Sequence, residues 1–106
     1  MNPLPGELYL VDLGMAGKVR PAIVVSREDP DSPRAIALCA PLTTQNRGSA
    51  YEVGLGKLRI LDKESWVNVQ GLMAIGHEKL IRRLGRISSS QLEQVKTALR
   101  FAFDLK

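Results

Sequence analysis

The sequence predicts a mainly β domain of the α+β class, in which short strands are followed by one C-terminal helix. The first two-thirds of the chain consists of short apolar, β-branched runs separated by Gly, Pro, Asn and Asp. Helical periodicity begins only after Ser88. The length of 106 residues and the lack of an internal repeat predict a single domain over residues 1–106.

Three strands are expected before Pro41. Residues 8–13 form the first, and Gly14 begins the turn that ends it. Residues 21–26 form the second, an almost unbroken β-branched run that is typical of a strand buried on both faces. Its proline is expected to open the strand, because proline cannot donate to the centre of a ladder. For the same reason, the third strand, residues 35–40, is expected to stop at Pro41.

The middle of the chain alternates between polar loops and half-exposed strands. Residues 43–49 are polar and irregular, whereas residues 51–53 and 66–69 alternate in the manner of strands. Residues 72–75 are expected to form a last short strand. The stretch that follows is recognised only by its cluster of basic side chains: Lys79, Arg82, Arg83 and Arg86.

An amphipathic helix is expected at the C-terminal end. Ser88 and Gln91 have the spacing of a capping box, in which each side chain satisfies a free backbone N–H at the helix start. Apolar residues then recur at helical spacing, with polar residues on the other faces: Leu92, Val95, Leu99 and Ala102, with Phe103 beside them. This pattern predicts a helix that packs one stripe on the sheet.

The charge balance and the numbers of Cys and His residues limit the classes of function that are expected. Fifteen Lys and Arg against eleven Asp and Glu leave a net charge of +4, which suits a polyanionic partner such as nucleic acid. Cys39 and His77 are the only residues of their types, so a protein-built zinc site is not expected, and no metal or other cofactor is predicted. A lone cysteine, no membrane-length apolar run and no signal-peptide pattern predict a cytoplasmic protein without a membrane partner.

Two motifs place a polar residue beside a proline at the edge of an apolar run. Residues 17–22, Gly-Lys-Val-Arg-Pro-Ala, present Arg20, and residues 40–44, Ala-Pro-Leu-Thr-Thr, present Thr43. A rigid strand end is a good place from which to present a side chain to a ligand. Together with residues 6–13, Gly-Glu-Leu-Tyr-Leu-Val-Asp-Leu, these motifs resemble the MazF/PemK family of toxin endoribonucleases. The resemblance runs in order along nearly the whole chain.

The resemblance implies an SH3-like barrel and the toxin component of a type II toxin–antitoxin system. The implied activity is metal-independent, sequence-specific cleavage of single-stranded RNA (mRNA), which leaves 2′,3′-cyclic phosphate and 5′-hydroxyl ends. It also implies a homodimer whose RNA groove straddles both subunits. A cognate antitoxin is expected to inhibit by laying an acidic segment in that groove.

Arg20 is the first expected catalytic residue. A guanidinium donates two parallel hydrogen bonds to phosphate oxygens, which stabilises the charge that develops when the 2′-hydroxyl of RNA attacks phosphorus. From spacing alone, an ordinary surface arginine is an equal alternative, but the resemblance places the matching arginine in the active site. Because a guanidinium stays protonated, Arg20 suits the protonation of the 5′-oxygen better than the role of base. The general base is left open.

Thr43 is the second expected catalytic residue, since it matches the threonine of the family's Pro-x-Thr motif. Its hydroxyl is able to donate to a nonbridging phosphate oxygen; the alternative reading is a turn residue after a proline. Further donors are expected to bind RNA: Lys18, Thr44, Gln45, Asn46, Arg47, Arg82, Arg83 and Arg86. The alternatives are a polar loop for the residues after Thr43, and a solvated or antitoxin-binding face for the basic cluster.

Three other residues are expected to have structural rather than functional roles. His77 is expected in a solvated turn, Trp66 in the core, and Cys39 as an inert core residue. Residues 14–19 match a loop that borders the RNA groove in the family and changes conformation there; it is shorter here than in many relatives, so a less restrictive gate is expected.

One segment departs from the family pattern. Many relatives carry Asp-Gln followed two residues later by Arg, whereas residues 70–73 here read Gln-Gly-Leu-Met. Two alternative functions stay open, and this departure favours the second of them. One is a CcdB-like toxin that binds DNA gyrase through residues 101–106 on the same barrel. The other is a catalytically silent relative that binds RNA without cleaving it.

Overall fold

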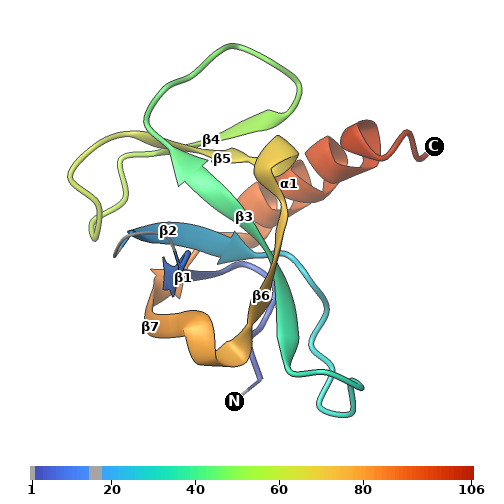
Figure 1. Ribbon diagram of the computed structural model, residues 1–106. Coiled ribbons are helices and arrows are strands. Elements are labelled where there is room, and N and C mark those ends of the chain that lie inside the picture. Colours follow the sequence, from blue (N-terminus) through green and yellow to red (C-terminus); the bar gives the residue numbers. More distant parts are fainter. Residues whose placement is uncertain (1, 15–17) are drawn as a thin grey trace.

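The computed structural model describes residues 2–14 and 18–106. Its elements follow the chain in this order: β1 (Glu7–Asp12), β2 (Val19–Val24), β3 (Ile36–Thr43), β4 (Glu52–Gly56), β5 (Ser65–Asn68), the short 3-10 helix η1 (Val69–Gly71), β6 (Met73–Gly76), the second 3-10 helix η2 (His77–Lys79), β7 (Leu80–Arg86) and the helix α1 (Ser89–Ala102). The predicted fold class, a bent antiparallel sheet of the SH3-like type with a C-terminal helix, is confirmed (Figure 1).

The strands form one sheet in the order β4-β5-β3-β2-β1-β7, with β6 also paired to β3. Strand β3 is the longest and is shared between partners. Its first half, from Ile36 to Cys39, pairs with β6, and its last residues, Leu42 and Thr43, pair with β5. Between them, β3 pairs with β2 up to Pro41. The end of β3 is therefore the place where the two halves of the bent sheet meet.

Two apolar clusters hold the sheet. The larger lies between the sheet and α1, and consists of Leu8, Ile23, Ala40, Val53, Leu55, Val67, Val69, Ile87, Val95 and Ala98. The smaller lies on the opposite face and consists of Tyr9, Val11, Ala22, Val24, Ala37, Cys39, Ile75 and Leu80. Successive residues of β2 alternate between the clusters, so Ala22, Ile23 and Val24 are buried as predicted for a strand covered on both faces.

The helix begins as predicted. Ser88 and Gln91 form a capping box, and the Gln91 amide also donates to the carbonyl of Leu55, which ties α1 to β4. The expected apolar stripe needs one correction. Phe103 lies past the helix end and is exposed, and the buried positions on α1 are Val95 and Ala98.

The strand predictions fail at two places. Strand β3 does not stop at Pro41 but continues to Thr43, because Pro41 lies where the ladder with β2 ends and the ladder with β5 begins. A proline is accommodated at such a ladder end. Strand β7 was not predicted as a strand at all. Its pairing with β1 is interrupted by two register shifts, which break the alternation that makes a strand visible in sequence.

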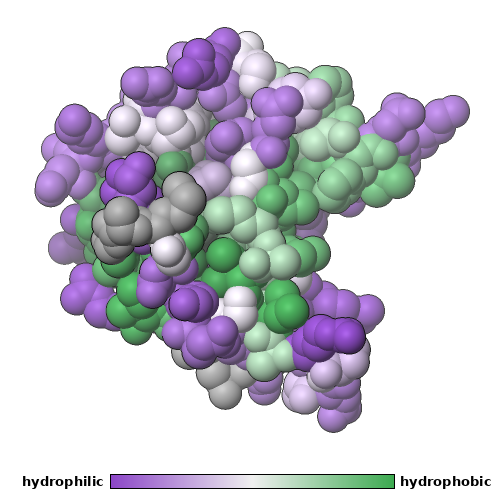
Figure 2. Space-filling model, in the orientation of Figure 1, coloured by the Kyte–Doolittle hydropathy of each residue, from purple (hydrophilic) through white to green (hydrophobic). Residues whose placement is uncertain are grey.

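The surface in Figure 2 is apolar over the middle of the molecule and hydrophilic around its edge. Ile36 and Leu38 of β3 contribute to the exposed apolar residues, each with 43% of its surface accessible. Within residues 2–14 and 18–106, no helix has the length and apolar character needed to cross a membrane.

Candidate active site at the end of β2 and β3

Arg20 and Thr43 occupy matching positions on neighbouring strands. The last pair of the β2–β3 ladder joins Ala22 to Pro41. Continuing this register by two residues in each strand places Arg20 opposite Thr43. In this register both residues share the alternation of Ala22, which belongs to the smaller apolar cluster. The sheet therefore brings together two residues that are far apart in sequence.

A cavity of about 570 Å³ lies at this end of the strands. It is lined by Arg20, Pro21, Leu42, Thr43, Thr44, Gln45, Leu61, Asp62, Lys63 and Ser65. The walls come from β2, from the end of β3 with the residues after it, and from the β4–β5 loop, residues 57–64. Both predicted catalytic residues and two of the predicted RNA-binding residues, Thr44 and Gln45, thus share one hollow.

The polar groups of this cavity favour an anion. The Nη1 of Arg20 donates to the carbonyl of Val19 at 3.3 Å, and the guanidinium is exposed. Among the residues that the structure describes, neither Arg20 nor Lys63 forms an ion pair. The Oγ1 of Thr43 accepts a hydrogen bond from the N–H of Gln45 at 3.1 Å, which leaves its own O–H free to donate. Two cations and a hydroxyl donor suit a phosphate group, and the cations outnumber the one carboxylate of the lining, Asp62.

A second, more polar cavity of about 410 Å³ adjoins the first, since Thr43 and Gln45 line both. Its remaining lining residues are Arg47, Ser49, Tyr51, Glu52, Asn68 and Gln70. The loop between β3 and β4 is held here by one carboxylate: Glu52 accepts hydrogen bonds from the N–H groups of Arg47 and Ser49. These bonds, that from Ser49 first, hold the pKa of Glu52 below its usual value.

Other predicted RNA-binding residues lie outside the first cavity. Lys18 and Asn46 are exposed but do not line it, and Asn46 accepts a hydrogen bond from the N–H of Gly48. Arg47 lines only the adjoining cavity. The central residues, 15–17, of the predicted gate loop lie outside the described residues.

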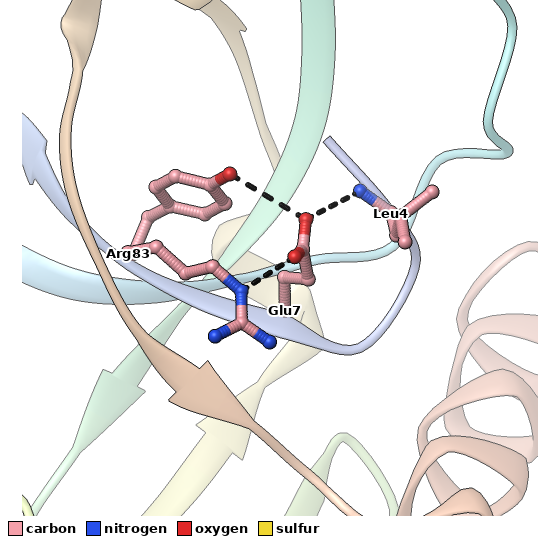
Figure 3. A network of polar contacts seen from close by, with 4 residues as sticks. Leu4, Glu7 and Arg83 are labelled. Carbon is pink, nitrogen blue, oxygen red and sulfur yellow. Dashed lines mark hydrogen bonds and ion pairs between the residues drawn. The ribbon is translucent and has the colours of Figure 1, made fainter. Parts of the chain in front are cut away.

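The three predicted RNA-binding arginines near the C-terminal helix lie on β7, which pairs with β1 on the side away from β2: Arg82, Arg83 and Arg86. They do not line the cavity of Arg20. Arg83 is already engaged, because its Nε donates to the carboxylate of Glu7 (Figure 3). A role for these arginines in holding RNA elsewhere on the surface stays a prediction.

His77 and Trp66 are both placed by the structure. His77 lies in η2, as expected for a turn, and does not line the cavity. The prediction of a core role for Trp66 is wrong: the residue is half-buried on β5, where it pairs opposite Thr43 and Gly54. Its neighbour Val67 takes the core position, because successive residues of a strand point to opposite faces.

Sequence reasoning missed the part of the cavity that comes from the β4–β5 loop. Leu61, Asp62, Lys63 and Ser65 belong to no recognised motif. The one signal was the density of charged residues between Gly56 and Ser65, which does not indicate where a loop folds. Among the described residues, no group of three or more His, Cys, Asp and Glu side chains is arranged to hold a metal ion.

Comparisons with known proteins agree on one family. Residues 4–103 match the family described as "PemK-like, MazF-like toxin of type II toxin-antitoxin system". The sequence is 33% identical over 103 residues to the probable endoribonuclease MazF5 of Mycobacterium tuberculosis. This match covers 96% of this chain and 94% of that protein. Among solved structures, the fold is similar to an endoribonuclease in complex with its cognate antitoxin from Mycobacterial species, with a TM-score of 0.85, 28% identity and coverage of 98% and 97%. It is also similar to the Mycobacterium tuberculosis toxin MazF-mt6, with a TM-score of 0.82, 29% identity and coverage of 94% and 98%.

Proposed function

Because the chain belongs to the family of PemK-like, MazF-like toxins of type II toxin–antitoxin systems, we propose that it cleaves single-stranded RNA as an endoribonuclease toxin. The single observation that carries the proposal is the meeting of Arg20 and Thr43 in one cavity with unpaired positive charge. The cleavage leaves a 2′,3′-cyclic phosphate and a 5′-hydroxyl and uses no metal ion.

The chemistry follows from the groups in the cavity. In RNA, the 2′-hydroxyl attacks the adjacent phosphorus, so the protein supplies charge stabilisation and proton transfer rather than a nucleophile. Arg20 donates to the nonbridging oxygens as negative charge builds up on them, and also protonates the departing 5′-oxygen. Thr43 donates its O–H to the same phosphate, held in place by the N–H of Gln45.

The partners follow from the family and the surface. A cognate antitoxin occupies the RNA groove with an acidic segment. The relative solved with its own antitoxin supports the existence of such a partner. The protein acts as a homodimer in the cytoplasm, where its mRNA substrate is found. The exposed Ile36 and Leu38 on β3 support the dimer, because a second copy would remove this apolar surface from water.

The decisive experiment incubates pure protein with a long single-stranded RNA in excess EDTA. We expect discrete fragments with 5′-hydroxyl ends from the wild type and a loss of about 10²–10³ in rate for Arg20→Ala. Arg34→Ala is the matched control, since Arg34 is also exposed but does not line the cavity.

Each failure has its own meaning. RNA that is bound but left intact would overturn the nuclease and favour the catalytically silent relative. Protein that neither binds nor cleaves RNA would favour the gyrase-binding reading. Cleavage that needs an added divalent ion would refute metal independence, and full activity of folded Arg20→Ala would refute the assignment of that arginine.

A further inference from the structure

We propose that Asp62 is the general base of the cleavage reaction. This rests on the proposed function and supplies the proton acceptor that Arg20 and Thr43 lack. Asp62 lines the same cavity as both residues and comes from the β4–β5 loop. Attack by the 2′-hydroxyl on phosphorus requires that its proton be taken up, so a nuclease of this kind needs an acceptor beside its phosphate site.

The chemistry of the lining residues leaves one such acceptor. The guanidinium of Arg20 and the ammonium of Lys63 are hydrogen-bond donors and carry no acceptor. Threonine and serine hydroxyls and the Gln45 amide do not hold an extra proton near neutral pH. Among the described residues that line the cavity, Asp62 is the one carboxylate. A carboxylate is an established general base in proteins.

The loop that carries Asp62 is anchored on both sides of this residue. Leu61 packs against the larger apolar cluster, and its N–H donates to the carbonyl of Leu58 at 3.1 Å. On the other side, Ser65 is buried, and its Oγ donates to the carbonyl of Lys63 at 3.1 Å. Asp62 therefore lies between two fixed points, which is the support that a reacting side chain needs.

The charges around Asp62 suit its role. Arg20 on β2 and Lys63 on the same loop are the charged side chains that line the cavity with it, and the end of β3 adds only uncharged groups. Among the described residues, none of the three forms an ion pair. The two cations are thus available to the phosphate, and the carboxylate is available to the 2′-hydroxyl.

The step balances without any co-reactant. The 2′-hydroxyl gives its proton to the Asp62 carboxylate, and the O2′ electron pair forms the new bond to phosphorus. The bond between phosphorus and O5′ breaks, and its electron pair stays on O5′, which takes a proton from Arg20. Asp62 then loses its proton to water, and Arg20 regains one from water. The products are the cyclic phosphate and the 5′-hydroxyl.

The test compares Asp62→Asn with Glu64→Gln under single-turnover conditions. Glu64 is an exposed carboxylate on the same loop that does not line the cavity, so its variant controls for loop charge. The substrate is an oligonucleotide that contains one ribonucleotide at the cleaved position. We expect Asp62→Asn to be slower by about 10²–10⁴-fold with unchanged RNA affinity, and Glu64→Gln to match the wild type. Asp62→Ala, checked for folding by circular dichroism, repeats the test with a second side chain.

A modified substrate distinguishes a residue that acts as the general base from one that acts as the general acid. When sulfur replaces the 5′-oxygen, the leaving group departs without protonation. Asp62→Asn must stay slow on this substrate, whereas Arg20→Ala is expected to regain the part of its rate that was lost with protonation of the leaving group. Normal rates for both Asp62 variants, or their recovery on the sulfur substrate, would overturn the role of Asp62 while leaving the nuclease intact. The control is the same oligonucleotide made entirely of deoxyribonucleotides, which has no 2′-hydroxyl. A wild-type protein that leaves RNA intact, or that cleaves this control, would overturn the proposed function and, with it, the role of Asp62 as the general base.

Discussion

Arg83 donates a hydrogen bond from its Nε to the carboxylate of Glu7 at 2.6 Å, and this contact ties the last strand to the first (Figure 3). The other carboxylate oxygen accepts from the N–H of Leu4 at 2.7 Å. Burial alone would raise the pKa of Glu7, but the hydrogen bonds from Leu4 and Arg83 outweigh it and hold the pKa below its usual value. The same burial, with the negative charge of Glu7 nearby, raises the pKa of Tyr9.

Stability should therefore depend on the ionisation of Glu7. Because its pKa is lowered by folding, its contribution is complete above the carboxyl pKa of the unfolded chain, about 4.3, and is lost as the pH falls through the lower pKa of the folded state. We expect Glu7→Gln to reduce the free energy of unfolding at neutral pH by about 1–3 kcal/mol, because the part-buried N–H of Leu4 and the guanidinium of Arg83 lose a charged acceptor. Urea unfolding of both proteins across the acid range measures this.

The control for that prediction is Glu93→Gln. Glu93 pairs with Lys96 on the helix surface, and its side chain is 66% exposed, so little change is expected. The gap between wild type and Glu7→Gln should narrow below about pH 4. If the difference in free energy of unfolding between the two proteins were equal at every pH, the effect of Glu7→Gln would come from the shape of the side chain rather than from its charge.

Gly71 should be difficult to replace. An ideally placed Cβ on Gly71 would lie 2.8 Å from Cγ of Pro41 in β3, which is closer than real Cβ contacts. We expect Gly71→Ala to cost about 1–3 kcal/mol in stability through this overlap. RNA cleavage should also fall, because a shift of Pro41 moves Thr43 two residues further along the strand. Urea midpoints and single-turnover rates measure the two effects.

Gly76→Ala is the matched comparison. There the nearest atoms, from 2.5 Å, belong to the carboxylate end of Glu78, which is free to rotate away, and the backbone at Gly76 is ordinary extended chain. Its stability and activity should stay near those of the wild type. A Gly76 variant as damaged as the Gly71 variant would refute the explanation by contact with Pro41.

The hydroxyl of Thr43 can be tested apart from its shape. Thr43→Val keeps the volume but removes both the donor to phosphate and the acceptor for the N–H of Gln45. Loss of a hydrogen bond to a charged group costs about 1.5–3 kcal/mol, so cleavage should slow by about 10- to 100-fold. Thr43→Ser should retain most of the rate. If Thr43→Val cleaved RNA as fast as the wild type, Thr43 would be a turn residue only.

Cys39 should be inert in the folded protein. Its side chain is fully buried in the smaller cluster, and burial raises the pKa of the thiol to about 11. A thiol reagent such as Ellman's reagent is expected to leave the native protein unlabelled at about pH 8 and to label it fully in denaturant. Rapid labelling of native protein would show that β3 opens locally.

The elements that the sequence predicted well are those with a strong local signal. The capping box at Ser88 and the apolar run of β2 each need only neighbouring residues to be recognised. Strand β7 was missed because its apolar residues do not alternate regularly, and its pairing with β1 is uneven. Strand β3 was cut short because the effect of Pro41 depends on which partner strand lies beside it.

The residues of the candidate site likewise fall into those with a local sequence signal and those without one. Arg20 and Thr43 were identified because the short motifs around Pro21 and Pro41 resemble those of the family, whereas spacing alone left a surface arginine and a turn residue as alternatives. Asp62 and Lys63 reach the cavity only through the path of the β4–β5 loop, which is anchored by the packing of Leu61 on the larger apolar cluster and by the burial of Ser65. No local pattern encodes such a path, because it depends on the core against which the loop packs.

The pairing of β2 with β3 fixes the geometry of the cavity. The length of the connection that joins these two strands therefore does not affect the cavity. None of the connecting residues, 25–35, lines that cavity. Insertions there leave Arg20 opposite Thr43, whereas one residue inserted within either strand turns a side chain to the wrong face. The connection is thus a place for a reporter peptide or affinity tag in an active enzyme, and the spacings from Arg20 to Val24 and from Cys39 to Thr43 must be kept.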